Sequence, residues 1–252
     1  LPNLVYERNL VSNEKIGIID LYTNAIAKNY KVNQTTKFLV NNIGWKSRSF
    51  SNASGLQSDL EGLLKVVTYD AENTDNYKNE EFNAQTFGAL AYNVSFPTFK
   101  ENNRKNRINF FTPKGSLRYA PGHMRNIHDD DLRLNYSNLF SLNKNSQIDI
   151  LESGTSATYG FEFTNLDYKN NVTGKENYSL FIGQIYNFEE NFDMPSRSSL
   201  DQKASDVVGR ASVKFSENFS LNNEFSVDHN FNDINYNDGK ASFILGNAKF
   251  NL

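Results

Sequence analysis

The sequence contains no cysteine and no long apolar run. Its 252 residues are 38% hydrophobic, with a mean hydropathy of −0.61. The longest apolar run, from Phe87 to Tyr92, is far shorter than the roughly eighteen apolar residues that a membrane-spanning helix needs. The sequence therefore excludes helical membrane spans. The absence of cysteine excludes disulfide bonds and thiol chemistry within the chain.

The sequence also has no large excess of either sign of charge. Lys and Arg together number 26 and Asp and Glu number 29, which gives a formal net charge of −3 and no basic stripe. Because a nucleic-acid-binding surface needs clustered Lys and Arg, we expect no nucleic-acid partner. No stretch keeps a helical period for long. The low mean hydropathy is compatible with strands that have one polar face.

Alternation of apolar and polar residues is the pattern that the sequence does contain. From Phe219 to Phe231, every second residue is mostly apolar and all the residues between are polar. Because side chains alternate across a strand, this pattern predicts a long strand with two unlike faces. A tilted strand that crosses a bilayer takes about nine to eleven residues, with apolar side chains toward lipid and polar ones toward the lumen. A soluble sandwich reverses these directions, and one strand does not distinguish the two.

The alternation recurs along the chain and predicts about eleven strands. They are placed at residues 2–10, 15–27, 35–49, 55–69, 84–97, 107–119, 148–165, 177–188, 206–215, 219–231 and 240–252. The aromatic content, with twenty Phe and thirteen Tyr, suits the aromatic girdles of a membrane barrel.

The connections between these strands alternate in length. The segments 70–83, 120–147 and 189–205 are long, whereas those near 12–14, 50–54 and 216–218 are short. The long ones follow every second strand, as they do in outer-membrane barrels with short periplasmic turns and longer extracellular loops. We therefore predict an all-β, antiparallel transmembrane outer-membrane β-barrel with its long loops on one rim. We expect residues 1–252 to form a single segment with no separate second domain.

One turn carries a more detailed expectation. For Phe215 and Phe219 to share a face across a hairpin, the two residues must lie opposite each other, which leaves 216–218 as a three-residue loop. Such loops commonly end in a left-handed residue. Because Asn tolerates that conformation, we expect Asn218 to adopt it.

In a membrane barrel the alternation divides the strands into two predicted surfaces. The lipid-facing set consists of Tyr159, Phe161, Phe163, Val213, Phe215, Phe225 and Val227. The lumen-facing wall consists of Arg210, Ser212, Lys214, Asn222, Glu224 and Asp228. Because this wall mixes both signs of charge, it would wet a lumen without binding a polar solute tightly.

No catalytic residue, metal site or cofactor is predicted. His123 and His128 lie near Asp129 to Asp131, but three adjacent acids in a loop are more often a solvated segment than a metal site. His229 lies two residues from the end of its predicted strand, so it is interpreted as a polar tip at the membrane interface. Catalysis is not predicted for it, because no Ser partner can be chosen.

Four segments of the second half combine recognisable motifs in a fixed order: 111–122, 126–163, 179–188 and 198–221. Their motif residues are Pro113, Arg118-Tyr119, Asp129 to Asp131, Asn138-Leu139-Phe140, Asp149, Glu152, Gly154, Gly183-Gln184, Tyr186 and Ser205-Asp206. In order and spacing they resemble the C-terminal barrel region of the LPS-assembly protein LptD family, also called OstA or Imp. Residues 107–231 carry most of the resemblance, and about the first hundred residues fit loosely.

The resemblance implies a role in delivering lipopolysaccharide to the outer leaflet of the bacterial outer membrane, as a transporter and not an enzyme. The polar interior would accept the head group while the lipid tails leave between the terminal strands of a larger parent barrel, of which this chain is a middle arc. The implied partners are lipopolysaccharide, outer-membrane lipids, an LptE-type lipoprotein plug, and periplasmic LPS-bridge proteins reached through an N-terminal domain outside this sequence.

Two alternatives remain open. The first is a complete outer-membrane barrel that acts as a lipid hydrolase or autotransporter pore, which calcium-dependent esterase activity would favour. The second is a soluble β-rich carbohydrate-binding protein, which solubility as a monomer without detergent would favour. Burial of Tyr159, Phe161, Phe225 and Val227 in a dry interior would contradict the membrane prediction. An open arc has two unpaired edges, so we expect the isolated chain to be unstable or to aggregate.

Overall fold

The computed structural model describes residues 2–31, 34–74, 77, 82–102, 104, 106–145, 147–168, 175–246 and 248–252. This part of the chain forms fourteen strands and one short 3-10 helix, η1 (Ser196–Ser198). The strands are β1 (Asn3–Asn13), β2 (Gly17–Lys31), β3 (Gln34–Lys46), β4 (Phe50–Ser51), β5 (Gln57–Glu72), β6 (Asn83–Ser95), β7 (Thr98–Asn102), β8 (Arg107–Ala120), β9 (Gly154–Asp167), β10 (Lys175–Asn187), β11 (Val207–Lys214), β12 (Phe219–Val227), β13 (Ile234–Leu245) and β14 (Ala248–Asn251). Within the same residues, no helix has the length and apolar character needed to cross a membrane.

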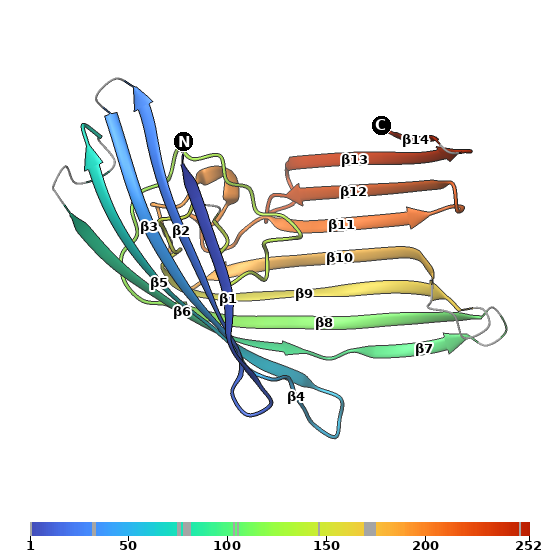
Figure 1. The fold of residues 1–252 in the computed structure, drawn as a ribbon. Helices are drawn as coiled ribbons and strands as arrows, with labels where there is room; N and C mark the ends of the chain where they lie inside the picture. The colour runs from blue at the N-terminus through green and yellow to red at the C-terminus, as the bar shows by residue number, and fades with distance from the viewer. Residues whose placement is uncertain are drawn as a thin grey trace.

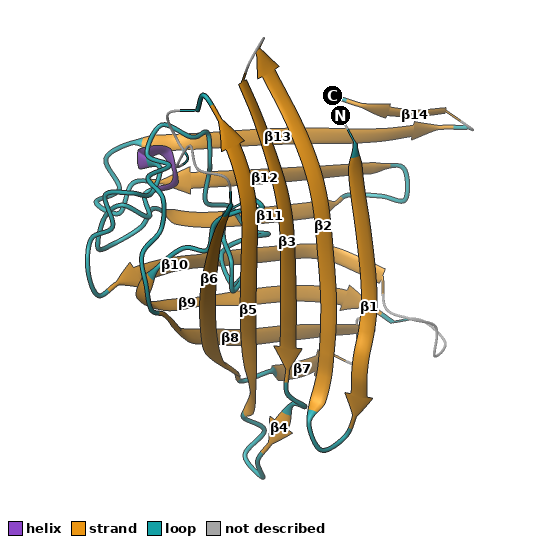
Figure 2. Cartoon of the chain, turned by 60° about the vertical axis from the view of Figure 1, so that its left-hand side comes forward, coloured by secondary structure: helices purple, strands orange, loops and turns teal. Residues whose placement is uncertain are grey.

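All the strands belong to one antiparallel sheet. Neighbours in the sheet follow the chain in the order β1-β2-β3-β5-β6-β8-β9-β10-β11-β12-β13-β14, while β4 pairs with β5 and β7 pairs with β8. Figures 1 and 2 show that the sheet is strongly curved, with β1 to β6 running in a different direction from β8 to β13. In the described residues no pairing joins β1 to β14, so the sheet is an open arc.

The predicted all-β antiparallel class is confirmed, but the predicted count of about eleven strands is wrong. Two short strands, β4 and β7, lie within connections, and residues 240–252 form the end of β13 and all of β14 instead of one strand. Gly246 lies between β13 and β14 with a φ of 61°, a conformation that glycine adopts without strain. The chain therefore reverses at a point where apolar residues on both sides resemble a continuous strand.

The three longest connections, 73–82, 121–153 and 188–206, follow β5, β8 and β10. Because every strand is antiparallel to its neighbours, these connections lie at the same rim, as predicted. Residues 75, 76 and 78–81 of the first connection and residue 146 of the second lie outside the described residues.

The buried apolar residues lie on the hollow side of the sheet. Phe181 and Ile185 of β10 pack against Leu139 and Leu200, which belong to the connections 121–153 and 188–206. Gly183 lies between the two β10 residues, and a Cβ there would be 2.5 Å from Leu139 Cδ2. The missing side chain therefore makes room for Leu139. We call the sheet face under these connections the inner face and the opposite face the outer face.

The hairpin between β11 and β12 confirms one expectation and corrects another. The Phe215 N–H donates to Phe219 O at 3.0 Å, and the two rings stack with centroids 5.2 Å apart, so these residues lie opposite each other. Asn218 does not have a positive φ, so the expected left-handed residue is wrong. The Ser216 N–H also donates to Phe219 O, and Ser216 Oγ accepts from the Asn218 N–H at 3.2 Å. These bonds close the turn without a left-handed residue.

Candidate functional site

The outer face holds all seven residues that the sequence predicted to contact lipid. Strand pairing sets them on one face, because directly paired residues of antiparallel strands point the same way. Leu180 of β10 pairs with Phe163 of β9 and with Ala211 of β11, so these three residues lie on the same face. Tyr159 is 51% exposed and Phe215 is 62% exposed. The remaining members of the set are Phe161, Phe163, Val213, Phe225 and Val227, none of which is fully buried.

These side chains are therefore not sealed in a dry interior, which was the outcome that would contradict a membrane protein. Their contact with lipid stays a prediction. Exposed apolar side chains also continue over the outer face of the first half of the sheet, as at Leu39, Leu64 and Leu90. A soluble monomer rarely exposes so extended an apolar surface.

Aromatic side chains on the outer face lie near both rims. On β8, Phe111 lies eight residues before Tyr119, and on β10, Tyr178 lies eight residues before Tyr186. A tilted strand crosses a bilayer in about nine to eleven residues, and membrane barrels carry aromatic girdles at both interfaces. The aromatic spacing thus fits strands of membrane-spanning length.

The inner face holds five of the six residues predicted to line a lumen. Arg210 of β11 pairs with Glu224 of β12, and its Nε lies 3.8 Å from Glu224 Oε1. Ser212, Lys214 and Asn222 lie on the same face by strand register. The sixth residue, Asp228, lies beyond the end of β12 in the turn to β13, where its N–H donates to Asp233 O.

Paired charges occur elsewhere on the inner face. Lys46 Nζ of β3 lies 2.6 Å from Glu61 Oε1 of β5, and Lys114 Nζ of β8 lies 2.5 Å from Glu162 Oε2 of β9. Each pair joins neighbouring strands and combines both signs. The inner surface is therefore polar but has no strong net charge along these strands.

The connection 121–153, which we call the cap, covers part of this polar surface. Lys65 of β5 is 2% exposed, and its Nζ donates to Ile148 O at 3.0 Å and to Ile150 O at 2.7 Å. A buried ammonium group without partners costs several kcal/mol. The two carbonyl groups of the cap satisfy this cation, so the position of the cap and the burial of Lys65 depend on each other.

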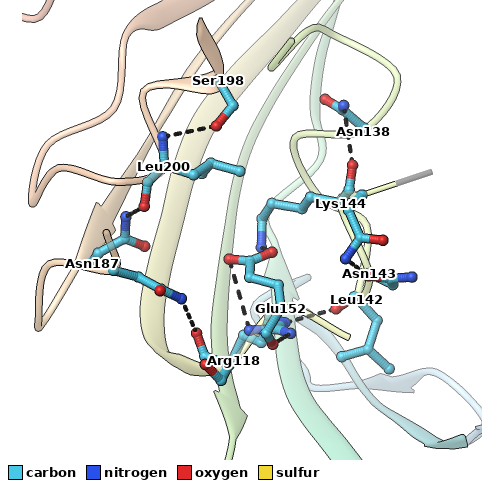
Figure 3. A network of polar contacts seen from close by, with 12 residues as sticks. Arg118, Asn138, Leu142, Asn143, Lys144, Glu152, Asn187, Ser198 and Leu200 are labelled. Atoms are coloured by element: carbon cyan, nitrogen blue, oxygen red, sulfur yellow. Dashed lines mark hydrogen bonds and ion pairs between the residues drawn. The ribbon is translucent and has the colours of Figure 1, made fainter. Parts of the chain in front are cut away.

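A second anchor of the cap is a buried ion cluster, shown in Figure 3. Arg118 of β8 and the cap residues Lys144 and Glu152 have side chains only 3%, 1% and 4% exposed. Glu152 lies 3.4 Å from Lys144 Nζ and 3.9 Å from Arg118 Nη1. Arg118 Nε also donates to Leu142 O of the cap at 2.7 Å.

The electrostatics of this cluster follow from one carboxylate lying between two cations. Burial alone would raise the pKa of Glu152, but Lys144 and Arg118 together hold it below its ordinary value of 4.5. Burial lowers the pKa of Lys144, and the positive charge of Arg118 lowers it further against the opposing effect of Glu152. Glu152 is therefore the ionised centre that holds both cations in the cap interface.

Sequence reasoning assigned no anchoring role to these residues. Lys65 is the only charge in the apolar segment from Leu63 to Val67, and a lone charge in such a segment indicates a buried cation that needs a partner. Arg118 and Glu152 were named as motif residues of the resemblance, without a structural role. Their partners are main-chain carbonyls and distant side chains, which alternation alone does not identify.

The histidines and acids of the long connections take part in contacts between loops. His128 Nδ1 lies 3.2 Å from Met194 O, and Asp131 pairs with Arg197 at 3.1 Å, so these contacts tie the cap to the connection 188–206. His229 lies in the turn after β12, 3.2 Å from Asp228. Within the part of the chain that the structure describes, no group of three or more His, Asp or Glu side chains is arranged to hold a metal ion.

A family model confirms the resemblance found in the sequence. The model described as "LptD: LPS transport system D" matches residues 18–252, which extends the likeness from 107–231 over almost the whole sheet. A comparison with curated proteins found no match.

Proposed function

Because the chain belongs to the LptD family of LPS transport system D proteins, we propose that it is part of a translocon that inserts lipopolysaccharide into the outer leaflet. Members of this family are outer-membrane transport proteins of Gram-negative bacteria. The proposed location is accordingly the outer membrane, with the long connections on the extracellular side. The chain is proposed to have no catalytic role.

The observation that carries this proposal is the difference between the two faces of one curved sheet. The outer face exposes apolar side chains such as Tyr159 and Phe215, whereas the inner face carries ion pairs such as Arg210 with Glu224. A glycolipid needs both environments at once, because its acyl chains avoid water and its saccharide must keep its hydrogen bonds. A wall with these two faces separates them during transport.

The proposed transport is passive. Inner-face pairs such as Lys114 with Glu162 offer donors and acceptors to the saccharide but no uncompensated charge that would hold a phosphate tightly. The acyl chains stay in the bilayer and leave between the terminal strands of a larger barrel, in which this chain is a single middle arc. Further strands would pair with the edges of β1 and β14.

The proposed partners follow from the same arrangement. Lipopolysaccharide and outer-membrane lipids are the ligands of the two faces. An LptE-type lipoprotein plug is proposed for the lumen not filled by the cap. Periplasmic LPS-bridge proteins are proposed to deliver the glycolipid from the rim with the short turns, opposite the cap.

Depletion of the protein in its own Gram-negative cells tests the proposed function. Newly made lipopolysaccharide is expected to stop reaching the cell surface, measured by its accessibility to an enzyme that modifies only surface-exposed lipid A. A plasmid copy of the gene should restore delivery. Normal surface delivery after depletion would contradict the proposal.

The orientation of the faces has its own test, because the chain contains no cysteine. The neighbouring residues Ala211 and Ser212 point to the outer and inner faces. In intact outer membranes, a polar maleimide should label the Ser212→Cys variant and leave Ala211→Cys unlabelled. Equal labelling would contradict a lipid-covered outer face.

A further inference from the structure

A cavity of about 590 Å³ lies between the inner face and the cap. One wall comes from the sheet and is polar, with Asp59 and Glu61 of β5, Asn93 of β6 and Lys114 of β8 among its lining residues. Asn93 Nδ2 donates to Asp59 Oδ1 at 2.9 Å, so donor and acceptor groups lie side by side on this wall.

A second part of the lining is aromatic, and we call it the aromatic wall. It consists of Tyr136 and Phe140 of the cap and Phe181 of β10. The Tyr136 and Phe181 rings meet edge to face with centroids 4.9 Å apart, and Phe140 lies 6.2 Å from Phe181 in a similar arrangement. The Arg210 guanidinium lies 5.1 Å from the Tyr136 centroid, which fixes that ring further. These contacts hold the aromatic wall in place.

A sugar ring has the shape and chemistry that these two walls require. Its C–H groups form apolar faces that pack on aromatic rings, and its hydroxyl groups both donate and accept hydrogen bonds around its edge. Asp59 and Asn93 bond to each other, but a purely apolar ligand would displace water from their remaining donor and acceptor positions and leave those unsatisfied, which costs free energy. The combination of walls therefore favours a saccharide over an acyl chain.

The charges of the cavity favour an uncharged saccharide. The two lysines that line it are already paired, Lys46 with Glu61 at 2.6 Å and Lys114 with Glu162 at 2.5 Å. Asp59 is bound by the Asn93 amide and adds a negative charge to the wall. A phosphate group would have to displace a carboxylate from a lysine and approach Asp59, and both steps are unfavourable.

We infer that this cavity binds an uncharged sugar residue of the glycolipid oligosaccharide as it passes along the inner face. The inference rests on the proposed function, because it assumes that lipopolysaccharide reaches the inner face. Since the aromatic wall belongs partly to the cap, the site exists only while the cap is in place.

Calorimetry on the purified full protein in detergent tests this inference. The probes are lipid-free oligosaccharide released from lipopolysaccharide, the same oligosaccharide after dephosphorylation, and inorganic phosphate. Both oligosaccharides are expected to bind saturably with similar affinity, and inorganic phosphate neither binds nor competes. Binding of the phosphorylated oligosaccharide alone, or competition by phosphate, would overturn the assignment to an uncharged sugar.

A matched pair of variants locates the site. Asn93→Leu removes the amide beside Asp59 and is expected to weaken oligosaccharide binding about tenfold. The control is Asn9→Leu, because Asn9 makes the same 2.9 Å amide bond to Asp20 between β1 and β2, outside the cavity. Equal weakening in both variants would overturn the location.

The outcome also separates this inference from the proposed function. If the protein delivers lipopolysaccharide to the cell surface but no oligosaccharide binds in calorimetry, the inferred sugar site is wrong and the transport function stands. If surface delivery does not depend on the protein, the proposed function itself fails. Tyr136→Ala provides a second variant from the aromatic wall, and it should weaken oligosaccharide binding without affecting the Asp59 to Asn93 bond.

Discussion

The inner faces of β10 and β12 belong to the same sheet but differ in chemistry. On β10, Phe181 and Ile185 point inward and are buried against the cap and the connection 188–206. On β12, Asn222 and Glu224 point inward and stay partly exposed. The outer faces of both strands are largely apolar.

The difference shows that the inner face can be apolar where the connections cover it, as on β10. Polar residues under the cap, such as Lys65 and Arg118, are bonded to cap carbonyls. Where the connections pack on the sheet, apolar side chains gain free energy from burial. Where no connection packs, the same face keeps polar pairs. The cap thus forms a second layer over one part of the sheet, and the rest of the sheet is exposed on both faces.

We call the part of the sheet that lies under the cap the covered region, and the part without such a layer the uncovered region. Removing Glu152, the counterion of the covered region, should have the largest effect on stability. Glu152→Leu leaves Arg118 and Lys144 buried without a carboxylate, and breaking a buried ion pair in this way costs about 3–5 kcal/mol. We expect faster hydrogen exchange in the cap and a lower denaturant midpoint for the purified protein.

The matched control is Glu224→Leu in the uncovered region. The side chains of Arg210 and Glu224 are 40% and 36% exposed, so losing their ion pair should cost less than about 1 kcal/mol. Similar losses at Glu152 and Glu224 would show that the cap does not bury its charges in the membrane-bound protein.

Filling the space under the cap should have the next largest effect. In Gly183→Ala the new Cβ would lie 2.5 Å from Leu139 Cδ2 and 3.0 Å from Tyr159 O, and overpacking of this kind costs about 1–3 kcal/mol. Limited proteolysis should then cut the cap more readily. Gly44→Ala is the control, because a Cβ at that inner-face position of β3 meets no atom within 4 Å.

A pH titration should have a smaller effect on the covered region than Glu152→Leu. The pKa of Glu152 lies below 4.5 in the folded protein, so the unfolded chain binds more protons in the window just below that pH. The stabilisation is complete above about pH 4.5 and decreases as the pH falls toward the folded pKa. The protection factors of the cap amides, which correct for the slower intrinsic exchange in acid, should therefore fall as the pH decreases, and in Glu152→Gln this fall should be smaller.

The same comparison explains how much of the fold the sequence could predict. In β12, one face is apolar and the other polar, so alternation identified both the strand and its two faces, including Phe225 and Glu224. The family resemblance then indicated the type of barrel. Asp228 was placed on the wrong element, because alternation continues past Val227 although the strand ends there.

The covered region could be predicted less well. In β10, Leu180, Phe181 and Ile182 are consecutive apolar residues, because lipid is predicted on one side and the cap lies on the other. Alternation carries no information where both faces are apolar. Lys65 and the Glu152 cluster depend on contacts between residues far apart in the chain, so only the folded structure brings them together.

The smallest expected effect comes from changing the charges of the pair Arg210 and Glu224 in the uncovered region. The Arg210→Glu variant places two carboxylates opposite each other on β11 and β12, which is destabilising by a fraction of a kcal/mol. The double variant Arg210→Glu with Glu224→Arg restores a pair of reversed polarity and should recover the denaturant midpoint of the unchanged protein. A double variant as unstable as the single one would mean that Arg210 acts chiefly through its contact with the Tyr136 ring, 5.1 Å away. In that case the contact of Arg210 with the cap would contribute more to stability than its ion pair does, and β11 would count as part of the covered region.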